Sequence, residues 1–163
     1  MQFQVGDAVF HPVHGVGHVV SIVERSFVED RARMYYEIST EKSTVWMPIE
    51  SSAIIGLRRV TAKRNLSRYR NILKSRPAPL DDDHGKRRLD ISNRLKAGSL
   101  QIVCEVVRDL TARGARKRLT QLDTDTLRRA RAELEQEWAA AAGISIADAG
   151  AEIDALLGER HGP

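Results

Sequence analysis

The sequence is poor in residues that build covalent or metal cross-links. Cys104 is the single cysteine among 163 residues, which excludes an internal disulfide framework and any cysteine-rich zinc site. Aromatic residues make up only 5% of the chain, so a large aromatic-lined cofactor cavity is not expected. We therefore expect a protein of a reducing compartment that carries no cofactor.

Long apolar runs are also missing. No stretch approaches the roughly 20 consecutive apolar residues that cross a bilayer. The opening segment MQFQVGDAVF lacks the basic region followed by an apolar one that marks a signal peptide. Hydrophobic residues at 42% and charged residues at 29% are enough to form a folded core. We expect a cytoplasmic protein without a membrane partner.

Charge is unevenly distributed, although the net formal charge is only +4. Residues 1–57 hold 4 Lys/Arg against 7 Asp/Glu, residues 58–118 hold 18 against 6, and residues 119–163 hold 4 against 9. A positive field confined to the middle of the chain indicates a polyanionic partner such as nucleic acid. An arginine-rich, solvated helical surface is the alternative interpretation.

The first 60 residues carry the pattern of short strands. β-Branched and aromatic residues are concentrated in residues 16–23, 34–39 and 43–49, and glycine marks the turn signals at Gly6, Gly15 and Gly17. Short strands at close spacing with glycine at the corners predict a small, strongly bent antiparallel barrel. We expect a barrel of SH3 or Tudor type over residues 1–60.

The apolar spacing becomes helical in residues 61–163. It predicts helices from about residue 65, over 82–97, from 99 to Gly114, from Asp123 to 143, and after a capping-box pattern at 145–148. In the second of these, Leu89 is expected to face inward. The fold class is therefore α+β, with an N-terminal β-barrel followed by a C-terminal α-helical bundle.

No set of residues predicts catalysis or metal binding. His11, His14 and His18 lie close in sequence, but Asp7 is the only carboxylate near them, so turn and surface roles are expected. The three aspartates at 81–83 fit the start of a helix better than a magnesium site. We expect no catalytic residues, no metal ligands and no enzymatic activity.

Several motifs occur in a fixed order along the chain. They are VGDAVFHPVHGVGHV at 5–19, VWMPIE at 45–50, LKAG at 95–98, VVRDL at 106–110 and LDTDTLRRA at 122–130. This ordered set resembles the CarD/CdnL family of bacterial transcription factors, whose domain type also occurs in the transcription-repair coupling factor.

The resemblance implies a function. Members of that family bind bacterial RNA polymerase through the N-terminal barrel, which docks on the β subunit by joining sheet edges. Their helical domain contacts promoter double-stranded DNA near the upstream edge of the transcription bubble and stabilises the open complex. The resemblance thus implies a regulator of transcription initiation that stays with polymerase at the nucleoid, and we expect it to act as a monomer.

Polymerase contacts are expected on the barrel. The resemblance places them at Arg25, after the strand at 18–24, and at Val45, Trp46 and Met47. Arginine and tryptophan often dominate interfaces. Side chains alternate along a strand, so these last three neighbours cannot all face one side. A core position in the barrel is the alternative for Trp46.

DNA contacts are expected at two places in the basic middle of the chain, because cations there can neutralise phosphates. The residues are His84, Gly85, Lys86, Arg87 and Arg88 at a helix start, and Arg113, Arg116 and Lys117 at a helix end. The alternative for the second set is complementarity to the helix dipole, which needs only one or two cations.

One family feature is replaced in this sequence. Family members carry a tryptophan that wedges into the minor groove, at a position that falls on His84 here. Histidine can stack on a base, but its ring is smaller and polar. Two interpretations follow, namely that His84 is a weaker wedge or that backbone contacts alone hold the DNA. The alternative function is a polymerase-binding adaptor without a wedge, which acts by competition or recruitment.

Overall fold

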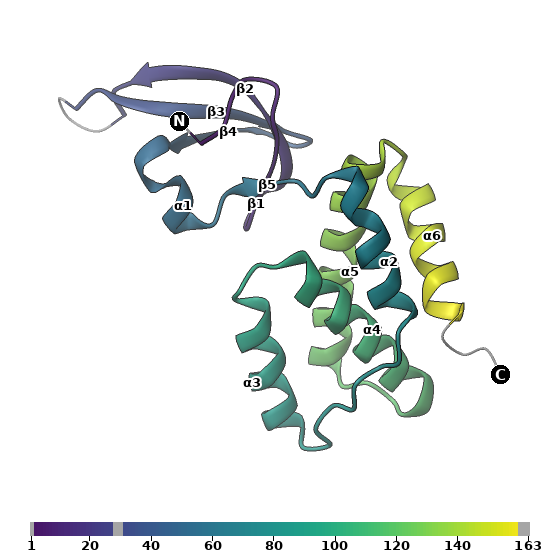
Figure 1. The fold of residues 1–163 in the computed structure, drawn as a ribbon. Helices are drawn as coiled ribbons and strands as arrows, with labels where there is room; N and C mark the ends of the chain where they lie inside the picture. The colour runs from purple at the N-terminus through teal and green to yellow at the C-terminus, as the bar shows by residue number, and fades with distance from the viewer. Residues whose placement is uncertain (1, 28–30, 160–163) are drawn as a thin grey trace. The chain divides into compact units, whose positions relative to one another are not determined.

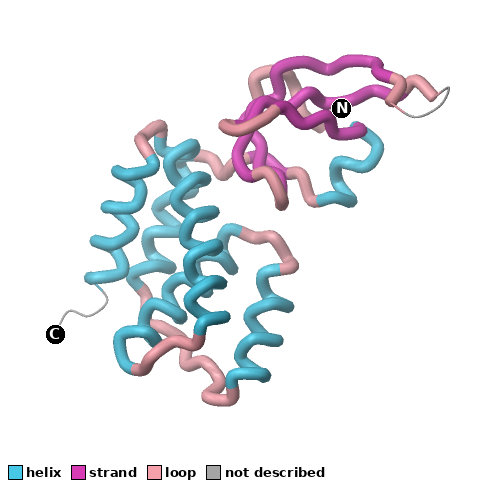
Figure 2. The backbone as a smooth tube through the Cα atoms, turned by 180° about the vertical axis from the view of Figure 1, so that it is seen from behind, coloured by secondary structure: helices cyan, strands magenta, loops and turns pink. Residues whose placement is uncertain are grey.

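The computed structural model describes residues 2–27 and 31–159. The chain divides into two compact units, Met1–Val60 and Thr61–Pro163. Strands dominate the first unit and helices build the second (Figures 1 and 2). This confirms the predicted α+β class. No helix in the described part of the chain is long and apolar enough to cross a membrane.

The first unit, here called the β unit, is an antiparallel sheet with strand order β4-β3-β2-β1-β5. The strands are β1 (Ala8–His11), β2 (Gly15–Arg25), β3 (Arg33–Thr40), β4 (Thr44–Pro48) and β5 (Arg58–Arg59). The short helices η1 (Ile49–Ser51) and α1 (Ser52–Ile55) precede β5. These last three elements were not predicted, because two to four residues show no periodicity.

The core of the β unit uses one face of each strand. Val9, Val19, Tyr36, Ile38 and Met47 are all at most 3% exposed and pack together with Phe3 and Leu57. Gly17 of β2 lies opposite Thr40 of the neighbouring strand β3. A Cβ atom there would come within 2.7 Å of the Ile38 side chain and 2.8 Å of a backbone oxygen. Glycine is therefore required at this close approach.

The second unit, here called the helical unit, contains five α-helices after η2 (Lys63–Asn65) in the described residues. They are α2 (Leu66–Lys74), α3 (His84–Leu95), α4 (Leu100–Arg116), α5 (Gln121–Ala142) and α6 (Ile146–Glu159). Trp138 of α5 is fully buried among apolar residues of α2, α4 and α6. Burial raises the pKa of the Cys104 thiol to about 12, so this cysteine is an unreactive core residue.

Three details of the helices differ from the prediction. Leu89 is 63% exposed, whereas Arg87 is buried in its place. Gly114 does not end α4, which continues to Arg116 and leaves Gly114 against Leu119. Thr120 caps α5, and Asp123 lies in its first turn. Only the first difference reflects a contact distant in sequence, the ion pair of Arg87 with Asp123.

Candidate functional site

β4 forms one edge of the sheet. It pairs with β3 on one side, and no strand within residues 2–27 and 31–159 pairs with its other side. An open edge presents backbone N–H and C=O groups that a partner strand can bind. The opposite edge, β5, is only two residues long. β4 is therefore the longer of the two edges available for strand addition.

Trp46 lies on the outer face of β4, opposite Glu37 of β3, and is 40% exposed. Its ring centroid lies 5.9 Å from that of Phe27. Phe27 in turn packs edge-on against Tyr35 at 5.1 Å. Trp46 is thus not a core residue. It belongs to an aromatic cluster beside the open edge, in which Phe27 and Trp46 are exposed and Tyr35 is buried.

Val45 and Met47 point to the other face of β4. Met47 is only 3% exposed and belongs to the core of the β unit, and Val45 is half-buried against the same core. The expectation that the Met47 side chain contacts a partner is therefore wrong, because strand alternation turns it inward.

Arg25 is the last residue of β2 and is exposed. It lies opposite Arg33 of β3 in the strand register. Two adjacent cations at this end of the hairpin repel each other unless an anionic group lies nearby. Arg25 is therefore an exposed cation at this end of the sheet.

The first set of expected DNA contacts lies in the first turns of α3. Asp83 caps the helix, and its carboxylate accepts the backbone N–H of Lys86 at 3.0 Å. His84, Gly85, Lys86 and Arg88 are exposed. The fifth member of the set, Arg87, is not.

The prediction that Arg87 contacts DNA is wrong. Its guanidinium lies 2.8 Å from the carboxylate of Asp123, and both side chains are buried. Nη1 also donates to the backbone oxygens of Asp81 at 2.8 Å and Asp82 at 3.2 Å. The charge of Arg87 is thus neutralised inside the protein. This pair fastens α3 to α5.

The VVRDL motif at 106–110 holds the segment that leads into α3. Asp109 is 2% exposed, and its carboxylate accepts the backbone N–H of Ala78 at 2.9 Å. Arg108 donates to the Ser75 hydroxyl at 2.8 Å. The motif is therefore structural, since it ties the link between α2 and α3 to α4.

The second set of expected DNA contacts lies at the end of α4. Asp82, just before α3, connects it to the first set. The Asp82 carboxylate accepts hydrogen bonds from Lys117 at 2.9 Å and Arg113 at 3.3 Å. These bonds lower the pKa of Asp82, so it is ionised at neutral pH. Arg116 is exposed at the end of α4. Asp82 thus holds two of the three cations expected to bind phosphate.

Replacing Asp82 with asparagine is expected to strengthen binding to duplex DNA. The substitution removes the charge that competes with phosphate for Lys117 and Arg113. Each extra phosphate contact steepens the slope of log K against log [salt] by about 0.9. Fluorescence anisotropy titrations at several salt concentrations measure both quantities.

The matched control is Asp125→Asn, which removes an exposed carboxylate that pairs with Arg128 at 3.4 Å on α5. This variant changes the net charge by the same amount as Asp82→Asn, but it frees no cation at the end of α4. If both variants strengthen binding to the same extent, the effect comes from net charge alone, and the competition at Asp82 is refuted.

His11 and Asp81 accept hydrogen bonds that hold local backbone turns. His11 is buried, and its Nδ1 accepts the backbone N–H groups of Val13 at 3.0 Å and His14 at 3.1 Å. Burial and the nearby His14 lower the pKa of His11, which favours the neutral ring that these bonds need. Asp81 accepts the backbone N–H of Asp83 at 2.9 Å. No group of three potential ligands in the described residues could hold a metal ion.

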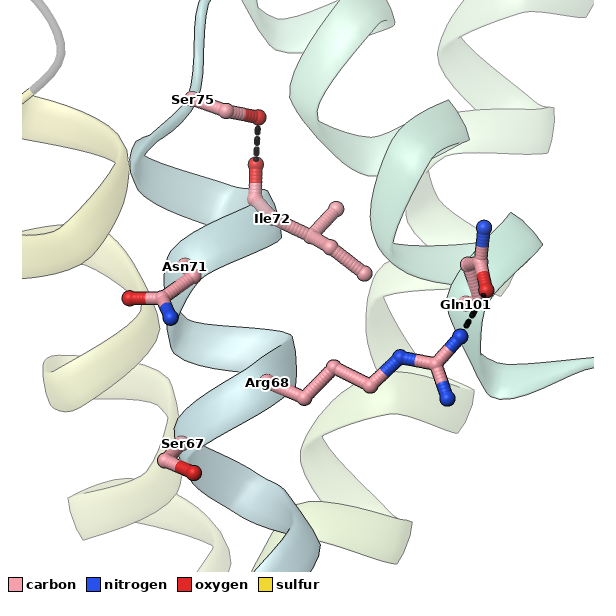
Figure 3. Close-up of a pocket in the computed structure, with 6 residues that line it drawn as sticks. All are labelled: Ser67, Arg68, Asn71, Ile72, Ser75 and Gln101. Carbon is pink, nitrogen blue, oxygen red and sulfur yellow. Dashed lines mark hydrogen bonds between the residues drawn. The ribbon is translucent and has the colours of Figure 1, made fainter.

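A surface pocket of about 510 Å³ lies over α2 and the start of α4 (Figure 3). Arg68 donates to the Gln101 side chain at 2.6 Å, and the Ser75 hydroxyl donates to the backbone oxygen of Ile72 at 2.5 Å. These polar groups satisfy one another. Ser67 and Asn71 project from another side of α2 in Figure 3, so the lining does not converge on a ligand.

Sequence reasoning missed two parts of these surfaces. Phe27 and Tyr35 lie near Trp46 once β3 and β4 are paired in register. The hairpin pattern of β3 and β4 was the signal that could have indicated this pairing. The contacts of Asp82 with the end of α4 had no local signal, because the partners are far apart in sequence.

Comparison with known proteins agrees with this arrangement. Residues 3–61 match the CarD-like/TRCF RID domain, an RNA polymerase-interacting domain, and residues 68–154 match the CarD C-terminal domain. The protein named "Putative transcription factor YdeB" of Bacillus subtilis (strain 168) is 30% identical over 118 residues, which cover 66% of this chain and 71% of that protein. These matches confirm the resemblance seen in the motifs. The chain belongs to the CarD family of transcription factors.

Proposed function

We propose that this protein regulates transcription initiation by binding the RNA polymerase β subunit through its β unit and upstream promoter DNA through its helical unit. The result is a longer-lived open complex. The observation that carries the proposal is the segregation of the two surfaces. The open edge and aromatic cluster belong to one unit, and the exposed cations of α3 and α4 belong to the other. In this proposal the protein acts as a monomer in the cytoplasm.

The polymerase half of the proposal uses main-chain and side-chain contacts together. A strand of the β subunit added to β4 would satisfy its unpaired backbone groups. Trp46 supplies a large apolar contact beside that strand, and Arg25 supplies a charge for an acidic residue. The match of residues 3–61 to a polymerase-interacting domain supports polymerase as the partner.

The DNA half uses the first turns of α3 and the end of α4. Lys86, Arg88 and Arg116 are exposed and can contact phosphates. His84 is the first residue of α3 and is also exposed. Its ring can stack on an unpaired base at the upstream bubble edge. Gly85 leaves the backbone beside His84 open to close approach.

One observation favours the second candidate, a polymerase-binding adaptor without a DNA role. Arg87 is buried in an ion pair, and Asp82 binds both Arg113 and Lys117. Three of the cations expected on DNA are therefore engaged within the protein. An adaptor would bind the same polymerase surface but act by competition or by recruiting another protein.

Binding to forked promoter DNA separates the two functions. We expect binding of the full chain to weaken as salt rises, because phosphate contacts release counterions. The double variant Lys86→Glu/Arg88→Glu is expected to bind more weakly and with a shallower salt slope. Arg128→Glu, an exposed cation of α5, is the control and should have little effect. If the unaltered protein shows no salt-dependent binding, the adaptor is the correct function.

A further inference from the structure

A carboxylate lies beside the aromatic cluster on the outer face of the sheet. Glu37 of β3 pairs with Trp46 of β4 on one side and with Ser21 of β2 on the other. Directly paired residues share one face of a sheet, with their Cβ atoms about 5 Å apart. Because Trp46 points outward, Glu37 does so too. The outer face therefore brings an indole ring and a carboxylate together next to the open edge of β4.

Glu37 is held in place, yet its charge is not neutralised by the chain. Its carboxylate accepts a hydrogen bond from the hydroxyl of Ser21. Within residues 2–27 and 31–159, no cationic side chain forms an ion pair with it. Arg25 and Arg33 lie on the same face, but the register places them four positions further along the strands, roughly 13 Å away. The carboxylate is thus oriented by a neutral group and keeps its negative charge.

The aromatic residues form two accessible walls rather than a closed cage. Phe27 is 57% and Trp46 is 40% exposed, and their ring centroids lie 5.9 Å apart with the planes at 53°. Tyr35 is only 7% exposed, and Phe27 packs edge-on against it. Aromatic cages bind free quaternary ammonium ligands. This open site suits instead a side chain whose own backbone holds it in position.

The open edge of β4 provides such a backbone. When a partner strand pairs with β4, the residue opposite Trp46 points to the outer face and lies beside the indole ring. Trp46 then lies between that residue and Glu37, because neighbouring strands are roughly 4.8 Å apart. Lysine and arginine lay their apolar stems along such a surface and keep the charged head in a polar environment. A basic side chain at this position would cover Trp46 and reach Glu37.

We propose that Trp46, Phe27 and Glu37 form a recognition site for one basic side chain, arginine or lysine, of the polymerase strand that pairs with β4. This inference rests on the proposed function. The cation is attracted by the faces of the aromatic rings and by the carboxylate. An apolar side chain would cover Trp46 but remove water from Glu37 without replacing it, and an acidic side chain would be repelled. The site therefore selects its partner strand by charge.

The first test measures the affinity of the full chain for immobilised RNA polymerase at several salt concentrations. Glu37→Gln keeps an acceptor for the Ser21 hydroxyl, and we expect it to bind roughly 5-fold more weakly. Its affinity should also fall less steeply as salt rises, because one attractive charge pair is gone. Trp46→Phe should retain more affinity than Trp46→Leu, since leucine is apolar but offers no ring face to a cation.

The control is Glu24→Gln, which changes the net charge by the same amount. Glu24 is exposed and lies opposite Met34, so strand alternation turns it away from the outer face. This variant should bind polymerase like the unaltered protein. If Glu37→Gln binds as tightly as Glu24→Gln, Glu37 recognises no cation and the inference is overturned, although the proposed function stands. If the unaltered protein does not bind polymerase, the proposed function fails and this inference fails with it.

A charge exchange identifies the basic residue of the partner. Each lysine and arginine on the exposed edge strands of the β subunit is replaced in turn by glutamate, and binding is measured with the unaltered protein and with Glu37→Lys. One replacement should weaken binding of the unaltered protein and strengthen binding of Glu37→Lys, as a double-mutant cycle requires for a direct pair. If no replacement shows this exchange, Glu37 does not face a basic side chain of polymerase, and the inference is wrong.

Discussion

Replacing Arg87 with methionine is expected to lower the free energy of unfolding of the helical unit by about 3–5 kcal/mol. The side chains of Arg87 and Asp123 are 3% and 6% exposed and lie 2.8 Å apart. Methionine fills much of the same volume, but it leaves the Asp123 charge buried without a partner. The backbone oxygens of Asp81 and Asp82 also lose their donor.

Urea unfolding followed by helical circular dichroism measures this loss. The double variant Arg87→Met/Asp123→Leu removes both charges and should recover much of the stability, because an apolar pair can replace a buried ion pair. Recovery will be incomplete, since the two backbone oxygens remain without Arg87. A single variant within about 1 kcal/mol of the unaltered protein would show that the pair does not hold α3.

The same substitution should separate DNA binding from polymerase binding. Arg87 does not lie on the surface, yet its ion pair with Asp123 holds α3, which carries the exposed Lys86 and Arg88, against α5. Arg87→Met is therefore expected to weaken DNA binding while polymerase binding, which the proposal assigns to the β unit, stays unchanged. Equal weakening of both would point to general unfolding rather than to a loss of α3 orientation.

Replacing Trp46 with alanine is expected to weaken binding to RNA polymerase by about 2 kcal/mol or more, roughly 30-fold. Trp46 is 40% exposed and lies beside the open edge of β4, against Phe27. The core of the β unit lies on the other face of the sheet. The substitution should therefore remove a partner contact without unfolding the β unit.

Biolayer interferometry with immobilised polymerase measures the affinity, and thermal unfolding checks the fold. Arg25→Glu should also weaken binding by reversing the charge offered to the partner. Ile54→Ala is the control, because Ile54 is 87% exposed on α1. If polymerase binds Trp46→Ala and Arg25→Glu as tightly as the unaltered protein, the interface does not lie at this edge.

The fold class followed from patterns that are local in sequence. The β-branched segments became β2, β3 and β4, and Ser145 accepts the backbone N–H of Asp148 at 3.0 Å, as the capping box predicted. Charged residues are seldom buried, so nothing local indicated that Arg87 would replace Leu89 on the inner face of α3. Its partner, Asp123, lies on another helix.

The candidate site was less predictable than the fold. Alternation showed that Trp46 and its neighbours could not all face one side, but the outward face became known only from the register that sets Trp46 opposite Glu37. At the other surface, the basic segments were visible in the sequence. The pairing of Asp82 with Arg113 and Lys117 was not, because it depends on how the start of α3 meets the end of α4.

The most direct test of the central claim is the lifetime of the open complex that polymerase forms at a ribosomal promoter. With the unaltered protein the lifetime is expected to increase. Trp46→Ala, which leaves the helical unit intact, and Lys86→Glu/Arg88→Glu, which leaves the β unit intact, should each abolish the increase. An unchanged lifetime with the unaltered protein, or full activity of either variant, would contradict a regulator that holds polymerase and DNA at once.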